Sequence, residues 1–95
     1  MSRYKVHNLK ENSRPGSWIK YWEDATNQRA GACHRVDCLT DHAPATDGAH
    51  VQLDRDGNDR WWIVPLCHTC NCQFGAHFTV EGPLVSAVDP KVILW

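Results

Sequence analysis

Apolar residues recur with helical spacing shortly after the N-terminal segment, within "WIKYWEDATNQR" (residues 18–29). Four of them stand at i, i+3, i+4 and i+7: Trp18, Tyr21, Trp22 and Ala25. This spacing predicts a helix with one aromatic face. Ser17 is suited to cap its start, and Gly31 is placed to end it. The aromatic stripe is more typical of core packing than of a ligand platform, because a small domain must bury its tryptophans.

The hydrophobic pattern changes from helical to β-prone in the second half of the chain. Two β-prone runs, "HVQL" (50–53) and "WWIVPL" (61–66), flank "DRDGNDR" (54–60). Asp-Gly-Asn within that segment is a strong turn signal. The pattern therefore predicts a β-hairpin.

Further elements are expected after the hairpin. A short helix is predicted from Cys67 to about Phe74, closed by Gly75, and "HFTV" (77–80) and "PLVSAV" (83–88) offer more strand material. The apolar C-terminal end, "DPKVILW", is expected to dock on the domain. The segment "CHRVDCLTDHAP" (33–44) has no apolar periodicity and is interpreted as a loop.

The chain of 95 residues has room for one small domain. We expect residues 1–16 to form a flexible or partner-dependent arm and residues 17–95 to form a single metal-binding domain. At this size a hydrophobic core alone gives marginal stability, and a metal is often recruited. The polar N-terminus offers neither a signal peptide nor a membrane span, so a cytoplasmic protein with no membrane partner is expected.

Five cysteines are many for such a chain. In a reducing compartment an odd number of thiols favours metal binding over disulfides. Two pairs are visible, Cys33 with Cys38 in the predicted loop and Cys67 with Cys70 in a C-x-x-C at the start of the predicted helix. Four thiolates from two separated pairs suit a tetrahedral structural Zn²⁺. A first helical turn also stabilises thiolates, because its free N–H groups point toward them.

Other residues compete for places in this ligand set. Cys72 is interpreted as a spare thiol in the core, with replacement of Cys70 as its alternative use. His34 and His42 lie beside the first pair, and His68 lies inside the second. Each histidine alone is more often packed or solvent-facing than a ligand, so four cysteines remain the simplest set.

The net charge of -1 hides an asymmetry. Basic residues outnumber acidic ones up to Ala32, whereas acidic residues predominate from Cys33 onward. Four thiolates would make the second part more negative still. Any electrostatic contact with nucleic acid must therefore use the N-terminal segment or a bound metal.

The order of loop pair, hairpin and helix with a second pair is the layout of a treble-clef zinc finger. With "GAH" on the first hairpin strand and "PLCHTCN" at the helix, the chain resembles the HNH (ββα-metal) nuclease family, in particular small standalone bacterial or phage members. The resemblance spans about Cys33 to Phe78. It implies an α+β fold, a small treble-clef zinc-binding domain with an added N-terminal helix and C-terminal strand material.

The resemblance also implies site residues. His50 matches the general base of the family, and Asn71 matches the helix position that binds a catalytic metal. Asn58 in the hairpin turn replaces the asparagine that braces the active-site backbone. The structural zinc ligands match Cys33, Cys38, Cys67 and Cys70.

This chain departs from the family pattern at two positions. Ala49 stands where an Asp or His commonly supplies a second metal ligand, and Trp62 stands where the family often has asparagine. On the nuclease interpretation, His50 would deprotonate water, and Mg²⁺ or another divalent cation held by Asn71 would stabilise the phosphorane. Arg55 or Arg60 could hold phosphate. DNA is expected as substrate in preference to RNA.

The alternative is a catalytically inactive treble-clef module that binds a protein or nucleic acid, for example an inhibitor of a host nucleic-acid enzyme encoded by a phage or mobile element. Side chains alternate along a strand, so Trp61 and Trp62 should face opposite sides, and one of them can be exposed. An exposed tryptophan is a typical anchor for a partner. A protein partner would then bind through this tryptophan or the N-terminal arm.

Overall fold

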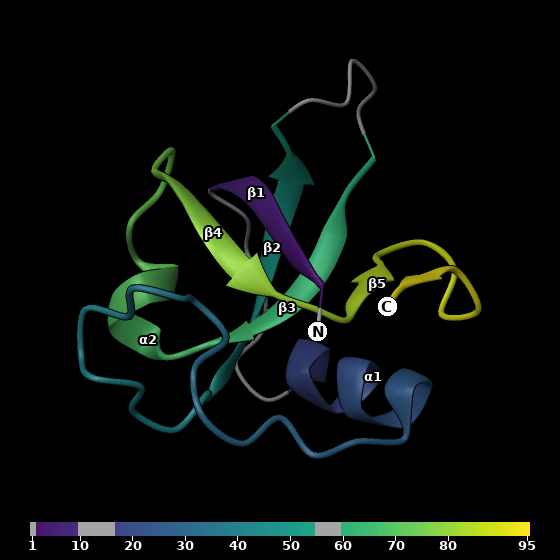
Figure 1. The fold of residues 1–95 in the computed structure, drawn as a ribbon. Coiled ribbons are helices and arrows are strands. Elements are labelled where there is room, and N and C mark those ends of the chain that lie inside the picture. Colours follow the sequence, from purple (N-terminus) through teal and green to yellow (C-terminus); the bar gives the residue numbers. More distant parts are fainter. Residues whose placement is uncertain (1, 10–16, 55–59) are drawn as a thin grey trace.

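A computed structural model of the chain describes residues 2–9, 17–54 and 60–95, and the fold is drawn in Figure 1. Within these ranges, two helices accompany a six-stranded antiparallel sheet of order β4-β1-β2-β3-β5-β6. The elements are, in chain order, β1 (Arg3–Asn8), α1 (Ser17–Thr26), β2 (Asp47–Leu53), β3 (Trp62–Leu66), α2 (His68–Asn71), β4 (His77–Glu81), β5 (Leu84–Ser86) and β6 (Ile93–Leu94).

The prediction of an N-terminal arm is wrong for residues 3–8. They form β1, which lies inside the sheet between β4 and β2 (Figure 1). In this strand Val6 and Asn8 are buried, whereas the intervening His7 is only partly buried. The segment alternates with the period of a strand, but Val6 is its one aliphatic residue, so the hydrophobic signal is weak. Pairing with β2 and β4, which are distant in the sequence, buries this strand, and the local hydrophobic pattern does not predict that burial.

Helix α1 forms where the apolar spacing predicts it and ends earlier than expected. It stops at Thr26, and Asn27 adopts a left-handed φ of 56°. Asparagine tolerates this conformation better than most residues, which makes it a suitable helix terminator. Gly31, also left-handed with φ 65°, lies further along in the connecting loop. The predicted end at Gly31 is therefore wrong by about one helical turn.

The predicted hairpin is confirmed as the antiparallel pair β2 and β3, in which His50 faces Ile63. Strand β2 begins at Asp47, three residues before the predicted run. The turn, with Asn58 and Arg55, lies outside the described residues. The hairpin belongs to a larger sheet than expected, since β1 and β4 extend it on one side and β5 and β6 on the other.

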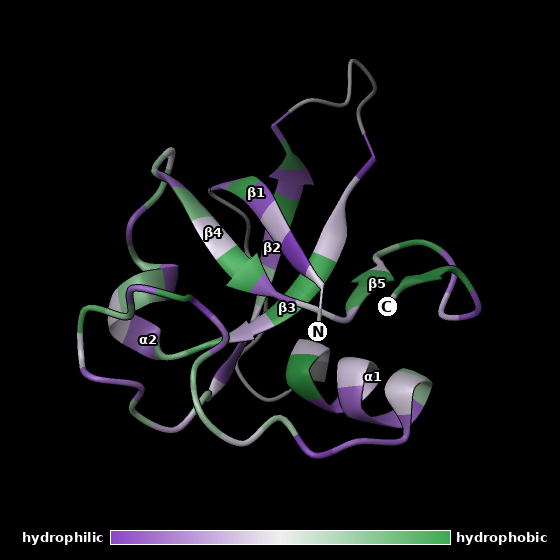
Figure 2. Ribbon diagram, viewed as in Figure 1, coloured by the Kyte–Doolittle hydropathy of each residue, from purple (hydrophilic) through white to green (hydrophobic). Residues whose placement is uncertain are grey.

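The elements after the hairpin follow the sequence prediction closely. Helix α2 is shorter than expected, and Gly75 follows it with a left-handed φ of 78°. The C-terminal end pairs with β5 through β6, as its apolar composition predicts. Strands β3 and β5 are hydrophobic over much of their length (Figure 2). No described helix has the length and apolar character needed to cross a membrane.

The central sheet has two differently covered faces. Helix α1 packs against β2, β3 and β5, and the buried residues there include Trp22, Ile63 and Val85. The other face buries Ala49, Val51 and three of the cysteines, Cys33, Cys67 and Cys70. Because side chains alternate along β2, a residue next to Ala49 in sequence points toward α1. The face of β2 on which a side chain lies therefore determines which of the predicted site residues can lie close together.

Gly48 lets α1 approach β2. A Cβ atom there would lie 2.4 Å from the carbonyl carbon of Trp18, so the helix backbone would have to move. We expect Gly48→Ala to lower the free energy of unfolding by about 3 kcal/mol, the upper end for overpacking. Chemical denaturation measures this loss.

The matched control for this substitution is Gly31→Ala. Its Cβ would meet nothing within 4 Å, and only the left-handed backbone opposes it. That strain costs about 1–2 kcal/mol. If Gly48→Ala were as stable as the wild-type protein, the close packing of α1 on β2 would be wrong.

Candidate metal centre

Four cysteines from two distant parts of the chain converge on one point. Cys33 and Cys38 come from the loop between α1 and β2, Cys67 follows β3, and Cys70 lies in α2. Their Sγ atoms all lie within 4.8 Å of one another. We call these four residues the cysteine clasp. It can hold a metal ion.

The spacing of the sulfur atoms fits a mononuclear site. Sγ of Cys38 lies 3.8 Å from that of Cys67 and 3.7 Å from that of Cys70. Tetrahedral coordination with metal–sulfur bonds of about 2.3 Å places its sulfur atoms about 3.8 Å apart. A disulfide would require about 2.05 Å, and all five cysteines are free. The sulfurs therefore have the separation of metal ligands.

Hydrogen-bond donors from the loop point at the clasp sulfurs. The backbone N–H of Leu39 donates to Cys70 Sγ at 3.5 Å, and that of Thr40 donates to Cys38 Sγ at 3.5 Å. The Thr40 hydroxyl lies 3.1 Å from Cys67 Sγ. Such donors stabilise thiolate over thiol. The loop conformation thus favours the ionised form that a metal requires.

The thiols of the clasp differ in acidity. Burial raises the pKa of Cys33 far above its ordinary value, and burial also raises the pKa of Cys70. Partial burial opposes ionisation of Cys38 as well, but hydrogen bonds from Thr40 and His42 outweigh it and lower its pKa to about 6. Four thiolates crowded in one buried site repel one another, so a cation is the natural compensation.

The competing ligands lie elsewhere. Cys72 is exposed, so its prediction as a core thiol is wrong, and its Sγ lies 3.4 Å from His68 Nε2. Neither residue is a member of the clasp. In His34, Nδ1 lies 3.0 Å from the backbone carbonyl oxygen of Glu81, and Nε2 lies 3.1 Å from that of Ala30. His42 bonds the carbonyl oxygen of Cys33 through Nδ1, at 3.2 Å. The ligand set of the clasp therefore consists of cysteines, as predicted.

His50 lies on the α1 face of the sheet. Its side chain is buried, and its ring centroid lies 4.7 Å from that of Trp18 and 6.0 Å from that of Trp61, both in edge-on geometry. This aromatic packing is the environment of a core histidine. The sequence resemblance predicts a general base at the same position.

Asn71 lies on the opposite face of the sheet, next to the clasp. Its side-chain amide donates to Asp47 Oδ2 at 2.9 Å, and its backbone carbonyl accepts from Asn8 Nδ2 at 2.7 Å. Asp47 shares its face with Ala49, whereas His50 points toward α1. The structure therefore does not bring His50 and Asn71 together, and Asn58 lies outside the described residues.

Asp47 binds α2 to the start of β2. Besides Asn71, it accepts hydrogen bonds from His68 Nδ1 at 2.9 Å and from the Thr46 hydroxyl at 3.0 Å. Burial opposes the ionised carboxylate, but these donors outweigh burial and lower the pKa of Asp47. Asp47 and Asn71 thus form a structural pair that holds the second half of the clasp against the sheet.

The sequence did not predict a second cluster of metal-ligating side chains, composed of His7, Asp54 and His77. His7 belongs to β1, His77 belongs to β4, and Asp54 directly follows β2, so no local sequence motif predicts the cluster. Only the strand register, which pairs His7 directly with His77, brings them together.

No family model, curated protein or solved structure matches this chain. The resemblance to the HNH family therefore stays a prediction from the quoted motifs. The functional proposals rest on the geometry of the clasp and of the surfaces around it.

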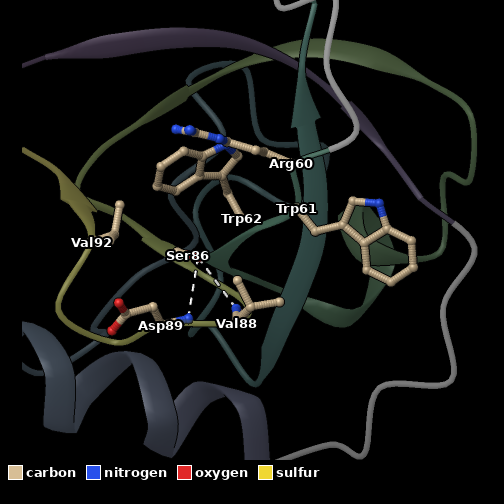
Figure 3. Close-up of a pocket in the computed structure, with 7 residues that line it drawn as sticks. All are labelled: Arg60, Trp61, Trp62, Ser86, Val88, Asp89 and Val92. Carbon is tan, nitrogen blue, oxygen red and sulfur yellow. Dashed lines mark hydrogen bonds between the residues drawn. The ribbon is translucent and has the colours of Figure 1, made fainter.

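A groove of about 640 Å³ lies next to the exposed Trp61 (Figure 3). It is lined by Arg60, Trp61, Trp62, Ser86, Val88, Asp89 and Val92. Trp61 directly precedes β3 and Trp62 is its first residue, and the two side chains project in opposite directions (Figure 3), as the alternation predicts. Trp62 is 2% exposed and Trp61 is 40% exposed. We call this hollow the Trp61 groove.

Proposed function

We propose that the chain is a zinc-stabilised, treble-clef-like binding module that docks an apolar segment of a partner protein in the Trp61 groove. The observation that carries this proposal is the 40% exposure of Trp61 beside a groove with further exposed apolar residues, Val88 at 91% and Val92 at 41%. Exposed aromatic anchors of this kind are typical of protein interfaces.

Zinc is the metal that the clasp fits best. Tetrahedral sites of four sulfurs bind zinc or iron, and a closed set of four thiolates is typical of structural zinc. The two sulfur–sulfur distances of 3.7 and 3.8 Å suit one ion. The clasp ties the loop between α1 and β2 to α2, so the metal would act on the fold and not on a substrate.

The charges around the groove favour a protein over nucleic acid. Arg60 and Asp89 are the charged residues that line it, and their charges balance. A phosphate backbone requires an excess of Lys and Arg, which the described residues that line the groove do not provide. An apolar peptide requires buried area and one or two polar contacts, which the groove can provide.

The nuclease interpretation has less support. It needs a base and a metal ligand at one cavity, but His50 and Asn71 lie on opposite faces of the sheet. His50 is also buried, with its ring packed edge-on against those of Trp18 and Trp61. A protein-binding role uses the exposed residues that the fold presents.

The proposal is tested by selecting heptapeptides from a random displayed library on the zinc-loaded protein, followed by affinity measurement of a selected peptide. We expect selected peptides to carry a large apolar residue, and Trp61→Ala to weaken their binding at least about tenfold, as for an interface hot spot. Trp95→Ala is the matched control, since Trp95 is 59% exposed but does not line the groove.

Three results would overturn this function. The first is selected peptides that bind Trp61→Ala and the wild-type protein equally. The second is plasmid cleavage with Mg²⁺, Mn²⁺ or Ni²⁺ that His50→Ala abolishes, which would favour the nuclease. The third is single-stranded DNA that binds more tightly than any peptide, which would replace the protein partner with nucleic acid.

A further inference from the structure

Two imidazoles and one carboxylate converge at the edge of the sheet away from α1. His7 Nδ1 lies 2.9 Å and His77 Nδ1 lies 3.0 Å from the same atom, Asp54 Oδ1. The two histidine rings lie side by side, with centroids 5.2 Å apart and planes inclined by 33°. Three different strands supply or precede these residues, so the sheet itself holds them in place.

The distances suit ligands of one metal ion. Two ligand atoms at about 2.1 Å from an ion, and at right angles around it, lie about 3.0 Å apart. The separations of 2.9 and 3.0 Å match that value. Two histidines and one carboxylate form a set that binds divalent transition metals and leaves other positions open.

A neighbouring side chain orients one of the ligands. His7 Nε2 lies 3.0 Å from Gln52 Oε1, an acceptor, so Nε2–H donates to this oxygen. The lone pair of a neutral His7 then lies on Nδ1, which faces Asp54. Metal-binding histidines commonly use one nitrogen for the metal and donate from the other to an oxygen.

The cluster is open to solvent beside a cavity. The side chain of His77 is 66% exposed, and those of His7 and Asp54 are 27% and 26% exposed. Asp54 and His77 line a cavity of about 330 Å³, together with Lys5 and Asp37. Water or a small anion near Lys5 can therefore reach a metal held there.

We propose that His7, Asp54 and His77 bind a second divalent transition-metal ion, of the class of Zn²⁺, Co²⁺ and Ni²⁺, whose remaining coordination positions open onto this cavity. The site is separate from the cysteine clasp in ligand chemistry, since it has nitrogen and oxygen donors and no sulfur. It is also independent of the Trp61 groove, because the two share no residues.

Titration of zinc-loaded protein with Co²⁺ tests the site, with calorimetry and visible absorption read together. We expect one further equivalent to bind without the intense thiolate-to-cobalt charge-transfer absorption, since the second site has no sulfur. His77→Ala should weaken this binding at least about 100-fold, and Gln52→Ala about tenfold, because loss of an orienting partner typically costs 10- to 100-fold. Asp54→Asn is a second ligand variant should His77→Ala fold poorly.

His68→Ala is the matched control. His68 is another exposed histidine, and its Nδ1 lies 2.9 Å from a carboxylate oxygen of Asp47, but this pair has no second imidazole. We expect His68→Ala to bind the further Co²⁺ like the wild-type protein. Absence of a further equivalent at millimolar Co²⁺, or an equivalent retained by both His77→Ala and Asp54→Asn, would overturn the site.

Discussion

Removal of the metal from the cysteine clasp is expected to unfold the domain. The clasp sulfurs join a loop that has no helix or long strand to α2 and β3. Structural zinc contributes about 10–16 kcal/mol of apparent binding free energy, whereas a whole domain is stable by about 5–15 kcal/mol. A strong chelator should therefore abolish the cooperative unfolding transition in circular dichroism, and added Zn²⁺ should restore it.

Cys67→Ser should have the same effect as the chelator, because it removes one ligand from the clasp. Cys72→Ser is its matched control, since the same atom is replaced at an exposed thiol that is not in the clasp. We expect Cys72→Ser to keep one metal per chain and near wild-type stability. If Cys67→Ser kept its fold while Cys72→Ser lost the metal, the ligand set would be wrong.

Trp22→Ala is expected to cause the largest loss of stability among single substitutions outside the clasp. Trp22 belongs to α1 and is fully buried against the sheet, and its indole N–H donates to the carbonyl oxygen of Pro83 at 2.9 Å. Truncation of a buried tryptophan to alanine costs about 3–5 kcal/mol. This loss is a large part of the stability of a small domain, so the midpoint of urea unfolding should fall steeply.

Trp61→Ala provides the comparison on the same residue type. Its side chain is 40% exposed, so we expect a loss well below that of Trp22→Ala. Both variants should retain the metal, because Trp22 packs in a different core cluster from the clasp cysteines and Trp61 belongs to neither cluster. Equal losses for the two variants would contradict the assignment of Trp22 to the core and Trp61 to the surface.

Local patterns predicted the elements whose burial depends on residues close in sequence. The aromatic stripe predicted α1, the turn signal and flanking β-prone runs predicted β2 and β3, and the two cysteine pairs predicted the clasp. Each signal is local, since the aromatic stripe spans residues 18–25, the hairpin signal spans residues 50–66 and the cysteine pairs span residues 33–38 and 67–70. The metal identity and the treble-clef layout stay predictions.

The features that the sequence did not predict depend on contacts between strands and helices that are far apart in the chain. Strand β1 contains one aliphatic residue, Val6, and is stabilised by its two neighbouring strands. The environment of His50 depends on which face of β2 the helix covers, and the close approach at Gly48 sets that choice. The cluster of His7 and His77 likewise exists only because β1 and β4 pair in this register.

The metal clasp is tested most directly by zinc X-ray absorption spectroscopy on the protein purified with one equivalent of metal. Four sulfur neighbours at about 2.3 Å are predicted, since all four ligands are cysteine thiolates. A nitrogen neighbour at about 2.0–2.1 Å would show that a histidine replaces a cysteine, and would contradict the four-sulfur clasp.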